Sequence, residues 1–84
     1  MQQLLAIGFG NAVVKDKVIA ILNPKSSPIV KFREEAKRAG RLIDVTHGRR
    51  TRSIVATDRY IILSAISFQT LLERFHQAER HSDG

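Results

Sequence analysis

Short apolar runs separated by glycine, asparagine and lysine dominate the first quarter of the chain. Three of these runs, at residues 4–7, 12–14 and 18–22, have the length of β-strands. Residues 8–11 read Gly-Phe-Gly-Asn, and glycine and asparagine both tolerate the positive φ of a tight turn. The pattern therefore predicts three strands, the last of which ends before Pro24.

A helix is predicted over residues 28–39, directly after these strands. Ser27 followed by Pro28 is a favoured helix start, because serine caps the first turn and proline fits its first position. Gly40 is a typical residue just beyond a helix C-terminus. Between these two signals, apolar residues recur at helical spacing and define one face: Ile29, Phe32, Ala36 and Ala39.

Strand character returns in the second half of the chain, at residues 42–46, 51–56 and 60–64. Residues 47–48, His-Gly, are expected to form the turn of a hairpin between the first two of these strands. Ser67 then caps a second helix, whose apolar stripe is formed by Phe68, Leu71, Leu72 and Phe75.

The predicted order β-β-β-α-β-β-β-α describes one small α+β domain with about six short strands and two helices. The domain is expected to cover residues 1–76, followed by a polar C-terminal tail at 77–84 that frays. A chain of 84 residues buries only about 60% of the surface that its unfolded form exposes, so its own core is marginal. Association of subunits is the expected source of further buried surface.

The residue composition narrows the chemistry. The chain has no cysteine, which excludes disulfides, thiolate metal sites and thiol nucleophiles. Its three histidines, His47, His76 and His81, are not spaced as metal ligands, so neither a metal nor a cofactor is expected. No apolar stretch approaches the ~20 residues of a membrane-spanning helix, and no signal peptide is recognisable. A cytoplasmic protein without membrane association is expected.

A strongly basic charge balance indicates a polyanionic partner. Fourteen lysines and arginines oppose eight acidic residues, which gives a net charge of +6 and a pI near 10.6. The excess lies within residues 15–59 and not in the tail. Most of the basic residues are arginines, which bind phosphate and guanine through two parallel hydrogen bonds. Nucleic acid is the polyanion that suits this charge best.

The most prominent local motif is Gly48-Arg49-Arg50-Thr51-Arg52. Its arginines, threonine and glycine are expected to form a compact phosphate-binding tip, because arginine forks match phosphate oxygens and glycine lets the backbone approach. The alternative is a solvated hairpin whose charges only discourage aggregation at a sheet edge. Lys15 and Lys17 form a second basic element, which matters for binding if the fold brings it beside the arginines.

Two other motifs carry weaker signals. Residues 8–11 lack the third glycine and the following helix of a dinucleotide-binding fingerprint, so they are interpreted as a structural turn with Phe9 as a core or interface anchor. Asp44 and His47 would make an acid–base pair, yet no second carboxylate, nucleophile or metal set completes an active site. The chain is therefore not expected to be an enzyme.

Four segments stand in a recognisable order: Ile7–Asn11, the strand ending at Pro24, Leu42–Asp44 leading into Gly48–Arg52, and Ile62–Ala65. Together, across about residues 5–75, they resemble the RemA family of bacterial extracellular matrix regulatory proteins. The resemblance implies a DNA-binding transcriptional regulator without a helix-turn-helix, related in fold to LytTR-type domains. It also implies an octameric ring with duplex DNA wrapped around its outside, at the nucleoid, and activation of biofilm matrix genes.

The resemblance assigns DNA binding to Arg49, Arg50 and Arg52, which the charge pattern also selects, with Thr51 and Lys15 as secondary candidates. A further arginine of the family aligns with Lys17, and lysine there keeps the charge but loses the bidentate fork. His47 stands where related sequences are expected to carry tyrosine. A ring would repeat this weak patch and raise affinity through effective concentration.

Three other functions stay open beside DNA binding. An RNA-binding accessory protein would present exposed aromatic side chains for base stacking. A structural ring-forming scaffold would keep its polyanion binding unchanged after loss of Arg50 or Arg52. A small nuclease using Asp44 and His47 would show metal-dependent cleavage.

Overall fold

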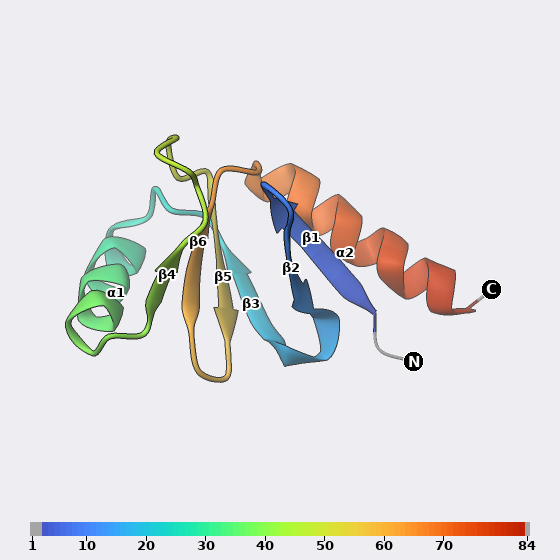
Figure 1. Cartoon of the computed structure of the whole chain (residues 1–84), viewed down its shortest axis with the longest axis horizontal. Helices are drawn as coiled ribbons and strands as arrows, with labels where there is room; N and C mark the ends of the chain where they lie inside the picture. The colour runs from blue at the N-terminus through green and yellow to red at the C-terminus, as the bar shows by residue number, and fades with distance from the viewer. Residues whose placement is uncertain (1–2, 84) are drawn as a thin grey trace.

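Residues 3–83 fold into two β-sheets and two helices in the predicted order, which confirms the α+β fold class (Figure 1). The computed structural model describes residues 3–83, with side chains up to residue 77. The strands are β1 (Leu4–Gly8), β2 (Asn11–Val14), β3 (Val18–Leu22), β4 (Leu42–Asp44), β5 (Ser53–Thr57) and β6 (Ile61–Ser64). The helices are α1 (Ser27–Arg38) and α2 (Phe68–Asp83), and a short 3₁₀ turn, η1, covers Lys15–Lys17.

The strands form a two-stranded hairpin and a four-stranded sheet. β1 and β2 pair antiparallel, with Leu5 opposite Val13. The larger sheet has the order β3-β5-β6-β4, in which β5 is antiparallel to both of its neighbours and β4 runs parallel to β6. The central strands β5 and β6 are buried along almost their whole length, which explains their continuous apolar sequence.

The hairpin predicted across residues 47–48 is wrong, because β4 pairs with β6 and not with β5. His47 and Gly48 do adopt positive φ, 59° and 82°, so a turn is present at the predicted place. A turn signal is local and does not specify which strand comes next in the sheet, and the buried β6 lies between β4 and β5. The chain from Asp44 to Ser53 therefore crosses the end of β6 as an irregular loop, which also contains the predicted strand residue Thr51.

Apolar residues on the two faces of the larger sheet form two separate cores. On one face, Ile54 and Leu63 pack with Ala36 of α1. On the other face, Val55 packs with Leu71 of α2 and with the β1–β2 hairpin. Successive strand residues point to opposite faces, so the two central strands supply both cores by alternation. α1 and α2 consequently lie on opposite sides of the sheet (Figure 1).

The ends of α1 follow the sequence signals only in part. Ser26 and not Ser27 occupies the N-cap position, and its side chain makes no capping hydrogen bond. At the other end Gly40 has a φ of 71°, and the Arg41 N–H donates to the Ala36 carbonyl at 2.9 Å. This pattern is a Schellman cap, as the glycine predicted.

Fewer apolar residues of α1 contact the sheet than their helical spacing predicted. Ile29 and Ala36 contact the sheet, whereas Phe32 is 40% exposed and Ala39 is exposed. The helix therefore leaves a large aromatic side chain in contact with solvent.

α2 begins directly after Ser67, as predicted, since the Thr70 N–H donates to Ser67 Oγ at 3.1 Å. The helix continues to Asp83, beyond the predicted stripe. Side chains from residue 78 onward lie outside the described part, so the fraying expected for the tail 77–84 stays a prediction. Between residues 3 and 83 no helix is long and apolar enough to cross a membrane.

Two fully buried serines tie the elements together where β6 ends. Ser64 Oγ donates to the Ile7 carbonyl at 2.8 Å and accepts the Ile66 N–H at 3.0 Å. Ser53 Oγ donates to the Ile66 carbonyl at 2.7 Å. These bonds replace the water that both hydroxyls lose on burial. They fix the β1–β2 hairpin and the approach to α2 against this end of the sheet.

Candidate nucleic-acid interface

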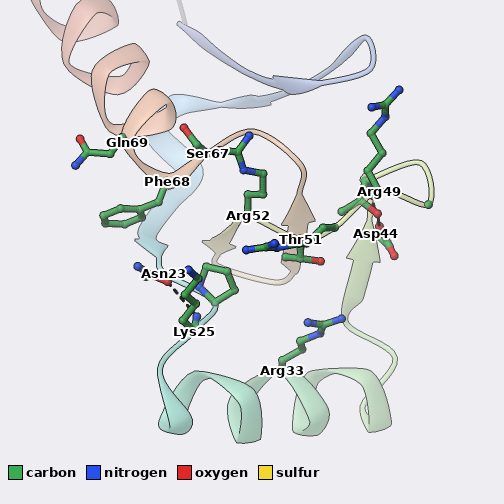
Figure 2. A pocket seen from close by; sticks show the side chains of 14 residues that line it. Asn23, Lys25, Arg33, Asp44, Arg49, Thr51, Arg52, Ser67, Phe68 and Gln69 are labelled. Carbon is green, nitrogen blue, oxygen red and sulfur yellow. Dashed lines mark hydrogen bonds between the residues drawn. The ribbon is translucent and has the colours of Figure 1, made fainter.

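A groove of about 890 Å³ lies at the end of the sheet where β3, β4 and β6 finish and β5 and α2 begin (Figure 2). Four segments line it: the turn between β3 and α1, α1 itself, residues 45–52 and the first turn of α2. The segment 45–52, which joins β4 to β5, is called the arginine loop below. Uncharged polar side chains in the lining include Asn23, Thr51, Ser67 and Gln69.

Positive charge dominates the groove. Its described lining residues include five cations and one carboxylate, Asp44; the cations are Lys25, Arg33, Arg49, Arg50 and Arg52. The predicted arginines and Thr51 are thus brought together in one place. The three loop arginines are solvent-exposed, so their guanidinium groups are able to reach an anion in the groove.

The backbone of the arginine loop is anchored at both ends to β6. The Val45 N–H donates to the Leu63 carbonyl at 3.0 Å, and the Arg52 N–H donates to the Ser64 carbonyl at 2.8 Å. The loop keeps a fixed path across the end of β6 while its arginine side chains extend from it.

Asp44 and Thr46 close the first turn of this loop. Asp44 Oδ1 accepts the Thr46 hydroxyl at 2.6 Å and the Thr46 N–H at 2.8 Å. These two hydrogen bonds, with a smaller contribution from the positive charge of Arg33, hold the pKa of Asp44 below its usual value of 3.8. Thr46 is itself buried, and its carbonyl accepts the Arg49 N–H at 3.1 Å. The ionised carboxylate therefore organises the backbone that carries the first arginine.

The turn between β1 and β2 reaches the arginine loop from the side. Phe9, predicted as a core or interface anchor, is 48% exposed and stacks on His47 of the loop. The Arg49 guanidinium carbon lies 5.7 Å from the centre of the Phe9 ring, within the range of a cation–π contact. Sequence spacing gave no signal for this contact, because the residues belong to segments far apart in the chain.

Lys15 and Lys17 lie at the opposite end of the sheet from the arginine loop. Lys17 precedes β3 and lines a separate hollow of about 500 Å³ with Thr57 and Tyr60, where β5 ends and β6 begins. The ammonium of Lys15 lies 4.8 Å from the centre of the Phe75 ring of α2. Within one chain the fold does not join this basic element to the arginines (Figure 1).

Lys25 and Arg33 belong to the groove although the motif did not include them. Arg33 follows Ile29 by four residues and precedes Ala36 by three, so it shares the face of α1 that contacts the sheet. A cation on an otherwise inward stripe is the signal that identifies Arg33. Lys25 carries no comparable signal, since it is one charged residue in a turn.

Asp44 and His47 are not arranged as an acid–base pair. The Asp44 carboxylate accepts two hydrogen bonds from Thr46, and the His47 ring stacks on Phe9. Among the described residues, no three histidine or acidic side chains gather in a way that would hold a metal ion.

The amino-acid sequence of the chain is similar to those of known proteins. Residues 4–75 match the family model of RemA-like, extracellular matrix regulatory protein A-like proteins. A protein of Oleidesulfovibrio alaskensis is 53% identical over 79 residues, which cover 93% of this chain and 94% of the relative. A protein of Thermotoga maritima is 57% identical over 76 residues, covering 89% and 83%. Both are regulatory proteins by name. The chain therefore belongs to the RemA-like family of regulatory proteins.

Proposed function

We propose that this chain is a DNA-binding transcriptional regulator that binds the phosphodiester backbone of duplex DNA through the arginine loop. The observation that carries the proposal is that Arg49, Arg50 and Arg52 all line one groove, with five cations against one carboxylate among its described lining residues. Guanidinium forks bind phosphate oxygens through paired hydrogen bonds, which lysine does not match. Backbone contacts of this kind position a protein on DNA and carry little sequence information.

The arrangement of the helices supports binding without a recognition helix. α1 and α2 are separated by three strands in residues 3–83, whereas a helix-turn-helix needs two consecutive helices. The groove cations lie mainly on loops at the end of the sheet. Loops and strand ends therefore replace a helix as the DNA-contacting elements in this proposal.

A homo-oligomeric ring, with eight subunits as the expected number and DNA wrapped on its outside, completes the proposed mechanism. One groove offers few phosphate contacts, and repetition raises affinity through effective concentration. Wrapping through backbone contacts would favour bendable DNA. Exposed apolar side chains are available for subunit contacts: Leu4, Ile19, Val30 and Phe32. Lys17 lies at the far end of the sheet. It would contact the same DNA as the arginines if the DNA crossed the subunit from one end of the sheet to the other, or if a neighbouring subunit placed its arginine loop beside Lys17.

Activation of biofilm matrix genes at the nucleoid is the regulatory outcome proposed with this binding mode. It rests on the description of the family, extracellular matrix regulatory protein A-like. The promoters that the ring binds would determine which genes respond.

The test combines light scattering during size-exclusion chromatography with fluorescence anisotropy on a promoter-length duplex. The wild type is expected to elute near the mass of eight subunits and to carry the DNA with it. Arg50→Ala and Arg52→Ala are expected to keep that mass and lose DNA binding. Lys31→Ala, an exposed cation of α1 outside the groove, is the matched control. Unchanged binding in the arginine variants would refute the proposal and favour a structural scaffold.

RNA binding is a second candidate function, favoured by the exposure of Phe9 beside Arg49. Unpaired bases stack on exposed aromatic rings, and RNA-binding proteins use this contact widely. Fluorescence anisotropy distinguishes the two functions if the affinity for a single-stranded RNA is compared with the affinity for duplex DNA of the same sequence. Tighter binding to RNA that depends on the Phe9 ring would replace the DNA proposal.

A further inference from the structure

We propose that Arg33 of α1 is a phosphate-binding residue, and that the groove grips one sugar–phosphate strand between the arginine loop and α1. This inference rests on the proposed function and adds to it a second cationic wall. In Figure 2 the Arg33 side chain extends from α1 toward the groove, on the side opposite Arg52.

Arg33 is held differently from the other cations of the groove. It is half-buried, whereas Lys25, Arg49, Arg50 and Arg52 are exposed. Of these five cations, Arg33 is the one that lies on a helix. Ile29 and Ala36 pack the adjacent turns of that helix against the sheet. A side chain that is already restricted loses less conformational entropy on binding, so Arg33 is pre-organised for a ligand in the groove.

The neighbouring carboxylate leaves the guanidinium available. The Asp44 carboxylate accepts two hydrogen bonds from Thr46, both of them on Oδ1. The positive charge of Arg33 contributes to the lowered pKa of Asp44, after the two hydrogen bonds from Thr46. Among the described residues no hydrogen bond joins Arg33 to Asp44, so the hydrogen-bond donors of Arg33 are available to phosphate oxygens.

The size of the groove matches a strand and not a duplex. A volume of about 890 Å³ is that of a site for a small molecule, which leaves room for a short stretch of backbone. Cations on two walls neutralise such a stretch from both sides. The arginine loop alone would give a convex tip that touches phosphates from one side.

The experiment compares Arg33→Gln with Lys31→Gln on the same helix. Both remove one positive charge, but Lys31 is exposed and does not line the groove. Anisotropy is measured on a duplex across a series of salt concentrations. Arg33→Gln is expected to lower the slope of log K against log salt by about 0.9 for each subunit that contacts DNA. Lys31→Gln is expected to leave the slope within error of the wild type.

Two further variants keep the inference separate from the proposed function and from folding. If Arg33→Gln behaves like Lys31→Gln while Arg52→Gln loses binding, the second wall is refuted and DNA binding through the loop stands. If Arg52→Gln also binds normally, both proposals fail. Arg33→Lys keeps the charge and should retain most of the slope at unchanged Tm. Loss of Tm in both Arg33 variants, with the slope of the wild type, would show a structural role and overturn the inference.

Discussion

The ring of Phe9 stacks on the imidazole of His47, with centroids 4.9 Å apart and planes inclined by 25°. Both residues have positive φ, 54° and 59°, a conformation that costs non-glycine residues about 1–2 kcal/mol each. Each backbone is held there by its own turn, and the stack joins the β1–β2 turn to the arginine loop. Strain of this kind concentrates at functional sites, and here it is found beside the groove arginines.

Phe9→Ala is expected to weaken DNA binding several-fold and to lower the free energy of unfolding by about 1 kcal/mol. The change removes the ring that stacks on His47 and faces Arg49, and aromatic pairs contribute about 0.5–1.5 kcal/mol. Anisotropy and thermal unfolding measure the two effects. Phe9→Tyr, which keeps the aromatic ring, is the control; equal loss of DNA affinity in both variants would contradict the role of the stack.

Thr46→Val should raise the pKa of Asp44 toward its ordinary value, because it removes the shorter of the two hydrogen bonds to that carboxylate. A lowered pKa in the folded state stabilises the protein above the ordinary value of 3.8 and ceases to do so as pH falls through the folded value. The wild type should therefore be more stable than Thr46→Val at neutral pH, and the difference should shrink below about pH 4. Thermal unfolding between pH 3 and pH 7 tests this, and a difference independent of pH would count against it.

Ser64→Ala is expected to destabilise the fold by about 2 kcal/mol. The substitution leaves the Ile7 carbonyl and the Ile66 N–H without their partner in a buried site. Ser26→Ala is the matched control, since the Ser26 hydroxyl is exposed and makes no capping hydrogen bond. Thermal unfolding at one protein concentration should separate the two variants clearly, and equal Tm values would show that Ser64 is dispensable.

Gly8→Ala should destabilise the β1–β2 turn more than Gly10→Ala does. Both glycines have positive φ, 106° and 79°, but a Cβ at Gly8 would lie 3.3 Å from the Ile66 side chain, whereas one at Gly10 meets no atom within 4 Å. Gly10→Ala should therefore cost only the backbone term of about 1–2 kcal/mol. Chemical denaturation measures both, and an equal loss would show that Ile66 moves aside.

The order of elements could be predicted from the sequence because its signals are local. Gly40 ends α1 and Ser67 caps α2 as expected, since each signal depends on a few neighbouring residues. The partner of β4 could not be predicted, because the positive φ at His47 and Gly48 fits a hairpin and a crossover equally well. The pairing of strands that are distant in sequence depends on how the whole domain packs. In this sheet β6, and not β5, lies next to β4.

The candidate site was predictable where its residues are contiguous. Arg49, Arg50 and Arg52 remain together because one short loop carries them. Lys17 was grouped with them by family resemblance, but its position before β3 places it at the other end of the sheet. Arg33 joins the groove through the orientation of α1, which only the packed helix defines.

The crossing of β6 by residues 45–52 gives that loop more length than its span requires. Its ends lie on strands that are two positions apart in the sheet, a gap of about 10 Å that roughly three extended residues would cover. The eight residues present leave a surplus, which rises above the end of the sheet (Figure 1). Val45, Thr46 and Arg52 are held against the sheet, so the surplus lies in residues 47–51, and a loop shortened there would no longer project its arginines. We therefore expect the length of this loop to serve the proposed DNA binding more than the stability of the fold.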